Sequence, residues 1–327
     1  MMKKGVAPEG SAEYLGAIAR AAIGSENSEL VRKLDEHLDW GYTELAFAAD
    51  IGEVEIARYL STRADLSSED PSDFVAMAAA NRARDREYRA RAERPLAAPR
   101  RSGGIAGKRG TFPHVLESWS PWLRHDEVDL SDYPVGIYVP EHYDDSRPFG
   151  LVVSMTNAKS SSRYPRHFEK TLDEHDLIWV GFDPYNGLHT IGGHANKAFC
   201  LAAVYHMLGY YKIDQSRIYI GGYSLGGQLT ERLLRTHPWM FDGAFFINIS
   251  YGGGSTREPY WSYCKRHLPI VTVEGDYDYN RTWAYKEYDE LLCSGYRRVY
   301  YMHEPMKGHK LISAESFEQI IRIIEDQ

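Results

Sequence analysis

The sequence predicts an α/β protein whose mainly parallel sheet is covered by helices on both faces, preceded by a small all-helical region. The first sign is a series of short, continuously apolar segments rich in β-branched and aromatic residues, which is typical of buried strands. The second is that segments with helical spacing of apolar residues lie between several of them. The third is a change near residue 113, before which helical patterns predominate.

Residues 1–80 are expected to form helices, because apolar residues recur at i, i+3 and i+4 spacing over 28–38 and 52–64. Residues 41–65 resemble an ankyrin helix–turn–helix unit, and an echo of the pattern precedes them. The turn departs from the repeat, since Glu44 and Ala46 replace its proline and histidine, and the offset is shorter than usual. Ankyrin-like repeats and plain helical hairpins are therefore two alternative interpretations of this region. In either case the region is expected to serve for contact with a protein partner.

Residues 81–112 form an arginine-rich segment that is predicted to begin as a helix and to end as a linker. Residues 81–110 contain nine arginines and one lysine against three acids. Their single aromatic residue is Tyr88, and Pro, Ala and Gly fill the second half, so a solvated linker is favoured over a nucleic-acid-binding segment. The formal net charge of −8 also argues against nucleic acid as a partner.

Residues 113–327 are predicted to form the α/β domain. Its expected strands are 135–139, 149–155, 177–182, 217–222, 243–250, 269–275 and 297–302. Helices are expected over 197–211, 225–237 and 314–324, the last of which closes the chain. Because a parallel sheet covered on both faces binds its ligands beyond the carboxyl ends of its strands, the site should lie in the loops there.

The segment 222–226 (GYSLG) fits the pattern G-x-S-x-G, directly after a predicted strand and before a predicted helix. That context is the one a nucleophile elbow requires, in which a strained turn exposes the hydroxyl of Ser224. Gly222 and Gly226 are expected to press together too closely for a Cβ, and Gly227 to let the helix approach the strand. The alternative is a glycine-rich turn with an incidental serine.

A serine nucleophile needs a base and the base needs an orienting acid, in the chain order Ser, acid, His. Asp276 and Asp278 follow the predicted strand 269–275. Asp278 is favoured because it completes a G-x-x-D pattern, with ordinary turn chemistry as the alternative. Among the later histidines, His303 and His309, we favour His309 as the general base because it lies on a glycine-preceded loop. The alternative is an exposed loop histidine.

With these residues placed, residues 115–327 resemble the α/β-hydrolases, especially esterases of the polyhydroxybutyrate-depolymerase and feruloyl-esterase type. The resemblance rests on the segments IDQSRIYIGGYSLGGQLT, HPWMFDGAFFI, VEGDYDYNR and GHKL. It implies hydrolysis of a carboxylic ester through an acyl-serine intermediate, with no cofactor and no metal. The expected substrate is an ester-containing small molecule or peptide.

An oxyanion hole would complete such a site with backbone N–H donors. One donor is expected at Leu225. The second should come from the loop after an early strand, at Asn157 or Ala158, where this chain has Thr-Asn and many relatives of the resembled family carry His-Gly. Substrate contacts are expected from loops at the carboxyl ends of the strands, at Tyr185, Asn186, His189, Tyr223 and Tyr251.

The cysteines and the N-terminus indicate a cytoplasmic protein. Cys200, Cys264 and Cys293 are odd in number and contain no CxxC pair, which favours a reducing compartment and no structural zinc. The N-terminus lacks the apolar core of a signal peptide, and no segment approaches the roughly 18 apolar residues of a membrane span. No association with a membrane is therefore expected.

Two other functions compete with ester hydrolysis. A peptidase or an acyltransferase would use the same three residues, on a protein or peptide recruited by the helical region. An interaction protein without catalysis belongs to another class. A non-catalytic module has no need for Ser224, Asp278 and His309 in the correct order, so the enzyme is favoured.

Overall fold

The computed structural model describes residues 19, 22–23, 28–34, 45–46, 48–49, 53–63, 70–92, 96–116, 134–155, 165–182, 193–249, 267–293 and 296–326. The chain divides into two compact units, and each is considered by itself. Unit 1 comprises Met1–Arg91, Ser255–His267 and Asp289–Val299. Unit 2 comprises Ala92–Gly254, Leu268–Tyr288 and Tyr300–Gln327.

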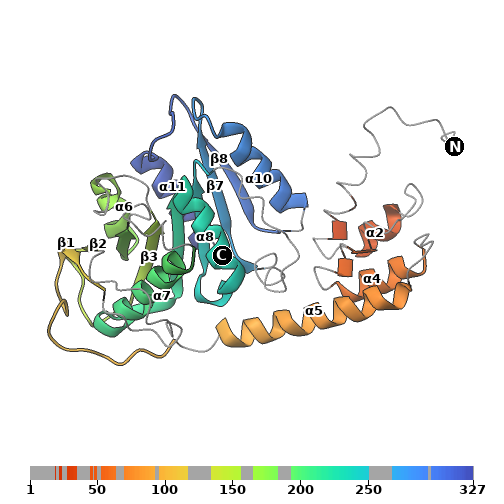
Figure 1. The fold of residues 1–327 in the computed structure, drawn as a ribbon, viewed down its shortest axis with the longest axis horizontal. Coiled ribbons are helices and arrows are strands. Elements are labelled where there is room, and N and C mark those ends of the chain that lie inside the picture. Colours follow the sequence, from red (N-terminus) through yellow and green to blue (C-terminus); the bar gives the residue numbers. More distant parts are fainter. Residues whose placement is uncertain are drawn as a thin grey trace. The chain divides into compact units, whose positions relative to one another are not determined.

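Unit 1 contains the N-terminal helices, drawn in red to orange in Figure 1. They are α2 (Ser28–Leu34), α4 (Val54–Ser61) and α5 (Pro71–Ala92). Their apolar faces pack with residues of the neighbouring helical segments in one buried core, which includes Ala22, Val31, Ala48, Ala49, Ile56, Ala57, Leu60 and Phe74. Helices are present within both segments where they were expected, 28–38 and 52–64, and α5 extends into the arginine-rich segment. The likeness to ankyrin repeats stays a prediction.

A buried carboxylate joins two distant segments within unit 1. Glu53, whose side chain is 10% exposed, accepts a hydrogen bond from Arg297 at 3.1 Å, and Arg82 lies 3.9 Å away. Asn81 donates to the carbonyl oxygen of Ala49, which fastens α5 to the preceding helical segment. Residues near 297 therefore belong with the N-terminal helices, although the sequence suggested only a strand there.

Unit 2 contains an eight-stranded sheet among the described residues, in the order β1-β2-β4-β3-β5-β6-β7-β8. The strands are β1 (Gly110–His114), β2 (Val135–Val139), β3 (Phe149–Met155), β4 (Leu177–Phe182), β5 (Ile213–Tyr223), β6 (Gly243–Ile247), β7 (Ile270–Gly275) and β8 (Val299–Glu304). β1–β2 and β2–β4 are antiparallel, whereas β4–β3, β3–β5, β5–β6 and β6–β7 are parallel. The mainly parallel sheet predicted from the apolar segments is confirmed.

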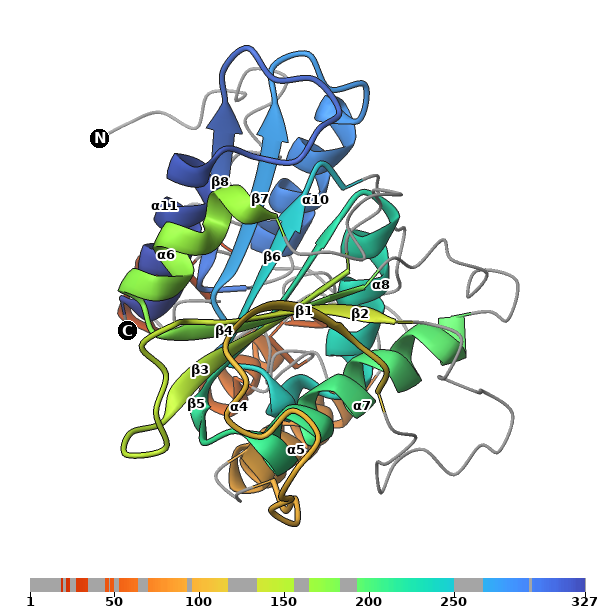
Figure 2. The same cartoon turned by 90° about the vertical axis from the view of Figure 1, so that its left-hand side faces the viewer.

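Helices cover both faces of this sheet, as predicted. Figure 2 shows α6 (Glu169–Glu174) and α11 (Ala314–Glu325) on one face and α7 (Gly193–Tyr210) and α8 (Leu225–Thr236) on the other. The remaining described elements are η1 (Arg166–Phe168), η3 (Pro238–Met240) and α10 (Arg281–Cys293). Among the helices that the structure describes, none combines the length and the apolar character that a membrane crossing requires.

The face covered by α6 and α11 shows how the buried strands form the core. Phe317 of α11 stacks on Phe168 with ring centroids 4.0 Å apart, and Trp179 of β4 packs against both rings edge-on. Aromatic pairs of this kind add to the free energy gained from area burial. Because the strands are apolar on both sides, the sheet needs a helical layer on each face.

β1 is an edge strand that the apolar pattern did not predict. It contains Pro113, and proline has no N–H to give to a sheet, so it is confined to edges or irregular positions. The segment before β1, residues 96–109, was expected to be a linker, but hydrogen bonds hold it to the rest of unit 2. The amide of Gln215 bonds both backbone groups of Leu96, and the N–H of Arg101 donates to the carbonyl of Gly209.

An ion-pair network lies at the start of β5 and the end of α11. His175 bonds Glu325 at 2.6 Å through Nδ1 and lies 3.3 Å from Glu318 through Nε2. Arg217 also donates to Glu325 and, at 2.6 Å, to the carbonyl oxygen of His175. The hydrogen bond to Glu325 raises the pKa of His175 despite partial burial. When the imidazole is protonated, it therefore holds the last helix to α6 more strongly.

We expect His175→Ala to destabilise the protein more in mild acid than in alkali. Because the pKa of His175 is raised by folding, its stabilisation is fully present below the pKa of the unfolded chain. It is lost as the pH rises through the folded pKa. Urea unfolding should show a loss of about 1–2 kcal/mol at about pH 5.5 and a smaller loss at about pH 9. In a Glu325→Gln background this pH dependence should shrink, and its persistence would contradict the assignment.

Candidate active site

Ser224 occupies a strained turn between β5 and α8. Its φ of 55° and ψ of −120° are rarely adopted by a residue with a side chain. The turn is fixed from the neighbouring strand, because the N–H of Ser224 donates to the carbonyl oxygen of Ile247 at 2.9 Å. The strand-to-helix elbow expected from the sequence is therefore present.

Two glycines make this turn possible. A Cβ added to Gly222 would lie 2.2 Å from the carbonyl carbon of Gly226, and one added to Gly226 would lie 2.0 Å from the carbonyl oxygen of Met155. Neither position has room for a side chain, as predicted. Gly227 differs from expectation, since a Cβ there would make ordinary contacts at 3.4 Å with Gly222 and Ile249.

Asp278 lies on the loop that follows β7, residues 275–280, called here the acid loop. Its N–H donates to the carbonyl oxygen of Gly275 at 3.0 Å, so the G-x-x-D segment closes as a turn. The carboxylate is fully shielded from solvent. One oxygen accepts from the N–H of Asn280 at 2.6 Å, and the other accepts from Nδ1 of His309 at 2.8 Å.

His309 lies on residues 305–310, called here the base loop, which follow β8. Its Nε2 is 2.9 Å from Oγ of Ser224. Because Nδ1 donates to the carboxylate of Asp278, the neutral ring leaves Nε2 as an acceptor for the serine hydroxyl. The structure thus brings together the three residues that were proposed from their order in the chain.

Two tyrosines flank the imidazole. The ring of Tyr279 lies 4.2 Å from that of His309, and the ring of Tyr223 lies 5.1 Å away. Tyr279 is 74% exposed, whereas Tyr223 is 8% exposed and its hydroxyl donates to the carbonyl oxygen of His309. Tyr223 therefore holds the backbone of the base loop through this hydrogen bond. Its predicted contact with substrate stays a prediction.

Asp276, the alternative acid, has a different partner. It forms an ion pair with His303, and its second oxygen accepts from the N–H of Met306 at 2.9 Å. Tyr277 between the two acids is 70% exposed, and its N–H donates to Lys307 at 2.7 Å. The acid loop thus alternates, with polar residues turned inward and tyrosines turned outward. Asp276 fastens this loop to the base loop.

The expected oxyanion donors are placed only in part. Leu225 is the first residue of α8, where backbone N–H groups have no partner within the helix. Met155, which ends β3, lies against Gly226, so the carboxyl end of β3 is beside the elbow. Asn157 and Ala158 lie outside the described residues, as do Tyr185, Asn186, His189 and Tyr251.

Sequence reasoning missed two asparagines beside these residues. Asn280 bonds Asp278 through its N–H, and its amide donates to the carbonyl oxygen of Asn248 at 3.2 Å. Asn248 follows β6 directly and is 1% exposed. The available signal was a polar residue inside the segment 243–250, which the apolar pattern predicts as a single strand.

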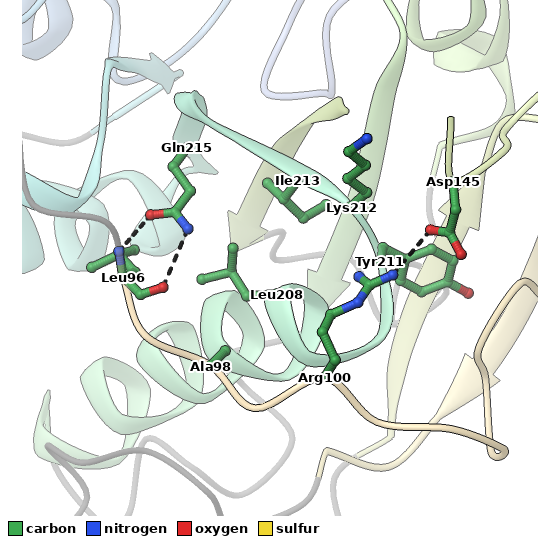
Figure 3. A pocket seen from close by; sticks show the side chains of 9 residues that line it. All are labelled: Leu96, Ala98, Arg100, Asp145, Leu208, Tyr211, Lys212, Ile213 and Gln215. Carbon is green, nitrogen blue, oxygen red and sulfur yellow. Dashed lines mark hydrogen bonds and ion pairs between the residues drawn. The ribbon is translucent and has the colours of Figure 1, made fainter. Parts of the chain in front are cut away.

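A separate hollow of about 390 Å³ lies at the other end of β5 (Figure 3). Its lining combines apolar and charged side chains, namely Leu96, Ala98, Arg100, Asp145, Leu208, Tyr211, Lys212, Ile213 and Gln215. Ile213 of the hollow pairs with Phe149 and Gly222 pairs with Met155, so about 20 Å of sheet separates the hollow from the end of β5 that precedes Ser224. It is therefore not part of the candidate site.

No protein-family model matches the chain, and no curated protein matches it. Solved structures do show likeness. S-formylglutathione hydrolase (FrmB) of Staphylococcus aureus is similar over 59% of this chain and 91% of its own, at 16% identity and a TM-score of 0.47. Esterase Est2 of Thermogutta terrifontis is similar over 66% of this chain and 91% of its own, at 14% identity and a TM-score of 0.47.

A candidate dipeptidyl aminopeptidase IV of Bacteroides ovatus is similar over 67% of this chain and 36% of its own, at 13% identity and a TM-score of 0.50. The present chain thus spans about a third of that longer protein. At this identity the likeness concerns the fold, which in this chain is a mainly parallel sheet with a tight turn between β5 and α8. The chain has the α/β-hydrolase fold.

The elbow of this α/β-hydrolase fold predicts opposite outcomes for two adjacent glycines. Gly226→Ala forces a Cβ onto the carbonyl oxygen of Met155, so we expect a loss of about 3 kcal/mol or more in the free energy of unfolding. Gly227→Ala fits its site and gains helix propensity, so the change should stay within about 1 kcal/mol. Urea unfolding followed by circular dichroism compares the two. Equal midpoints would show that the elbow is not packed as described.

Proposed function

We propose that the protein is a serine hydrolase that cleaves a carboxylic ester through an acyl-serine intermediate. The observation that carries the proposal is the continuous series of contacts from Oγ of Ser224 through the imidazole of His309 to the shielded carboxylate of Asp278. Nucleophile, base and orienting acid are each within hydrogen-bond reach of the next. An incidental serine would not account for a strained backbone beside a buried acid–base pair.

In the first half-reaction, Oγ of Ser224 attacks the acyl carbon while Nε2 of His309 takes its proton. The carboxylate of Asp278 keeps the imidazole in the required tautomer and stabilises the positive charge that forms on it. The negative charge develops on the former carbonyl oxygen, and the N–H of Leu225 is the proposed donor to it. Asn157 or Ala158 is proposed as the second donor.

The ester C–O bond then breaks, and the leaving alkoxide takes the proton from Nε2 of His309. A water molecule attacks the acyl carbon of the acyl-serine and gives its proton to the same nitrogen. When Oγ of Ser224 leaves the acyl carbon, His309 returns that proton to it. The products are a carboxylic acid and an alcohol, and the enzyme regains its starting state.

An accessory role is proposed for the N-terminal helices, with a protein partner as the contact. Unit 1 has an apolar core of its own, which supports this role. All three reacting groups lie in unit 2, so the helices are not needed for the bond-breaking steps. The proposed substrate is an ester-containing small molecule.

Ser224→Ala should reduce the hydrolysis of a p-nitrophenyl ester by about 10⁴-fold or more, because it removes the only nucleophile of the proposed mechanism. Spectrophotometric release of p-nitrophenol measures the rate, and an unchanged circular dichroism spectrum shows that the fold persists. A fluorophosphonate probe should label the wild type and not the variant. Turnover retained in the variant would refute the role of Ser224.

A matched pair of substitutions separates the two aspartates of the acid loop. Asp278→Asn loses the carboxylate that holds His309, so kcat should fall by about 10³- to 10⁴-fold. Asp276→Asn keeps an acceptor for Met306 and does not touch His309, so its effect should stay below about tenfold. The same p-nitrophenyl assay distinguishes them. A larger loss in Asp276→Asn would reverse the assignment of the acid.

A further inference from the structure

We infer that Asn248 is a positioning residue that couples the acid loop to the base loop. The inference rests on the proposed function, because its effect is exerted through the contact between Asp278 and His309. These two residues come from different strand ends, and their 2.8 Å contact lasts only while both loops keep their places. The side chain of Asn248 forms hydrogen bonds to both loops, and the hydroxyl of Ser224 and the imidazole of His309 bond other partners.

The two halves of the Asn248 amide serve different loops. Its oxygen accepts a hydrogen bond from the N–H of Gly275, where the acid loop begins, at 3.1 Å. Its nitrogen donates to the carbonyl oxygen of Lys310, the residue after His309, at 2.8 Å. One side chain therefore fixes the residue at the start of one loop and the neighbour of the base on the other.

The backbone of Asn248 is held as firmly as its amide. Its N–H donates to Val273 at 2.8 Å, and its carbonyl oxygen accepts from the amide of Asn280 at 3.2 Å. Its φ of 49° is left-handed, a conformation that asparagine tolerates better than most residues. This conformation ends β6 and turns the side chain toward the two loops instead of along the strand.

Ile247, the residue before Asn248, also fixes the position of the proposed nucleophile. The carbonyl oxygen of Ile247 accepts the N–H of Ser224, so the end of β6 holds the elbow as well. Ser224, Asp278 and His309 are thus all positioned from residues 247–248. Contacts on the outer side, between Asp276 and Met306 and between Tyr277 and Lys307, join the loops to each other but not to the elbow.

Few other side chains fit this position. A buried amide that points its oxygen at an N–H and its nitrogen at a carbonyl satisfies both groups. A carboxylate of the same shape would face the carbonyl oxygen of Lys310 with two acceptors and no donor. An apolar side chain would leave Gly275 and Lys310 each without this partner, and buried unsatisfied groups are costly.

The first test is Asn248→Gly, which removes the amide while glycine keeps the left-handed backbone. We expect kcat for a p-nitrophenyl ester to fall about 10- to 100-fold, because small misplacements of a base cost this much. The KM should change less than about threefold, since Asn248 is 1% exposed and is proposed to act on the base and not on the substrate. A kcat equal to that of the wild type would overturn the inference.

The second test, Asn248→Asp, keeps the shape and replaces the donor to Lys310 by a titrating group. Burial favours the neutral form of the introduced carboxyl, which donates to the carbonyl oxygen as the amide does. The ratio of variant to wild-type kcat should therefore rise severalfold as the pH falls from about 8 to about 6. A ratio that does not change with pH would contradict the proposed hydrogen bond, and this test stands even if the glycine variant does not fold.

Gln215→Ala is the matched control. Gln215 also bonds two backbone groups with one amide, both on Leu96, but at the far end of β5 (Figure 3). We expect it to lower stability and leave kcat unchanged, so an equal loss of kcat here would reduce Asn248 to a general structural role.

A wild type that neither hydrolyses the ester nor reacts with the fluorophosphonate would refute the proposed function itself. An active wild type with an unaffected Asn248→Gly variant refutes the positioning role alone.

Discussion

The contact of the Gly222 and Gly226 backbones at the end of β5 is the constraint on which the rest of the candidate site depends. Without it the chain could not turn from strand to helix within one residue, and Ser224 would not leave the sheet. The strain at Ser224 persists because the carbonyl of Ile247 and the start of α8 fix the backbone on both sides. A costly local conformation is thus maintained by ordinary sheet and helix bonds around it.

The order of the strands explains how residues far apart in the sequence meet. β5, β6, β7 and β8 are neighbours in the sheet in the same order as in the chain. Their carboxyl ends supply Ser224, Asn248, Asp278 and His309 in turn. Since adjacent strands lie about 4.8 Å apart, Asp278 follows a strand two widths from that of Ser224, and His309 follows one three widths away and must return across that gap. The hydrogen bonds between the loops hold the imidazole in this returned position.

The parts that the sequence predicted are those determined by local patterns. β2, β3 and β4 agree with their apolar segments because both faces of each strand are buried. The elbow was predictable because its glycines form the G-x-S-x-G pattern in the sequence. Other features depend on partners that no local pattern reveals. Pro113 concealed an edge strand, and the pairing of Glu53 with Arg297 joins segments 244 residues apart.

Buried and exposed side chains alternate along the acid loop, so different residues form its internal hydrogen bonds and its surface. Asp278 and Asn280 face inward and are nearly inaccessible, while Tyr277 and Tyr279 present most of their surface to solvent. Exchange at Tyr277 therefore leaves every inward hydrogen bond of Asp278 in place, whereas exchange at Tyr279 changes what covers the imidazole. A substitution at Tyr277 changes an outward contact, that of its hydroxyl with Met306, whereas one at Tyr279 changes the ring beside His309. The outward side chains of this loop can therefore vary while the hydrogen bonds of its inward side chains stay the same.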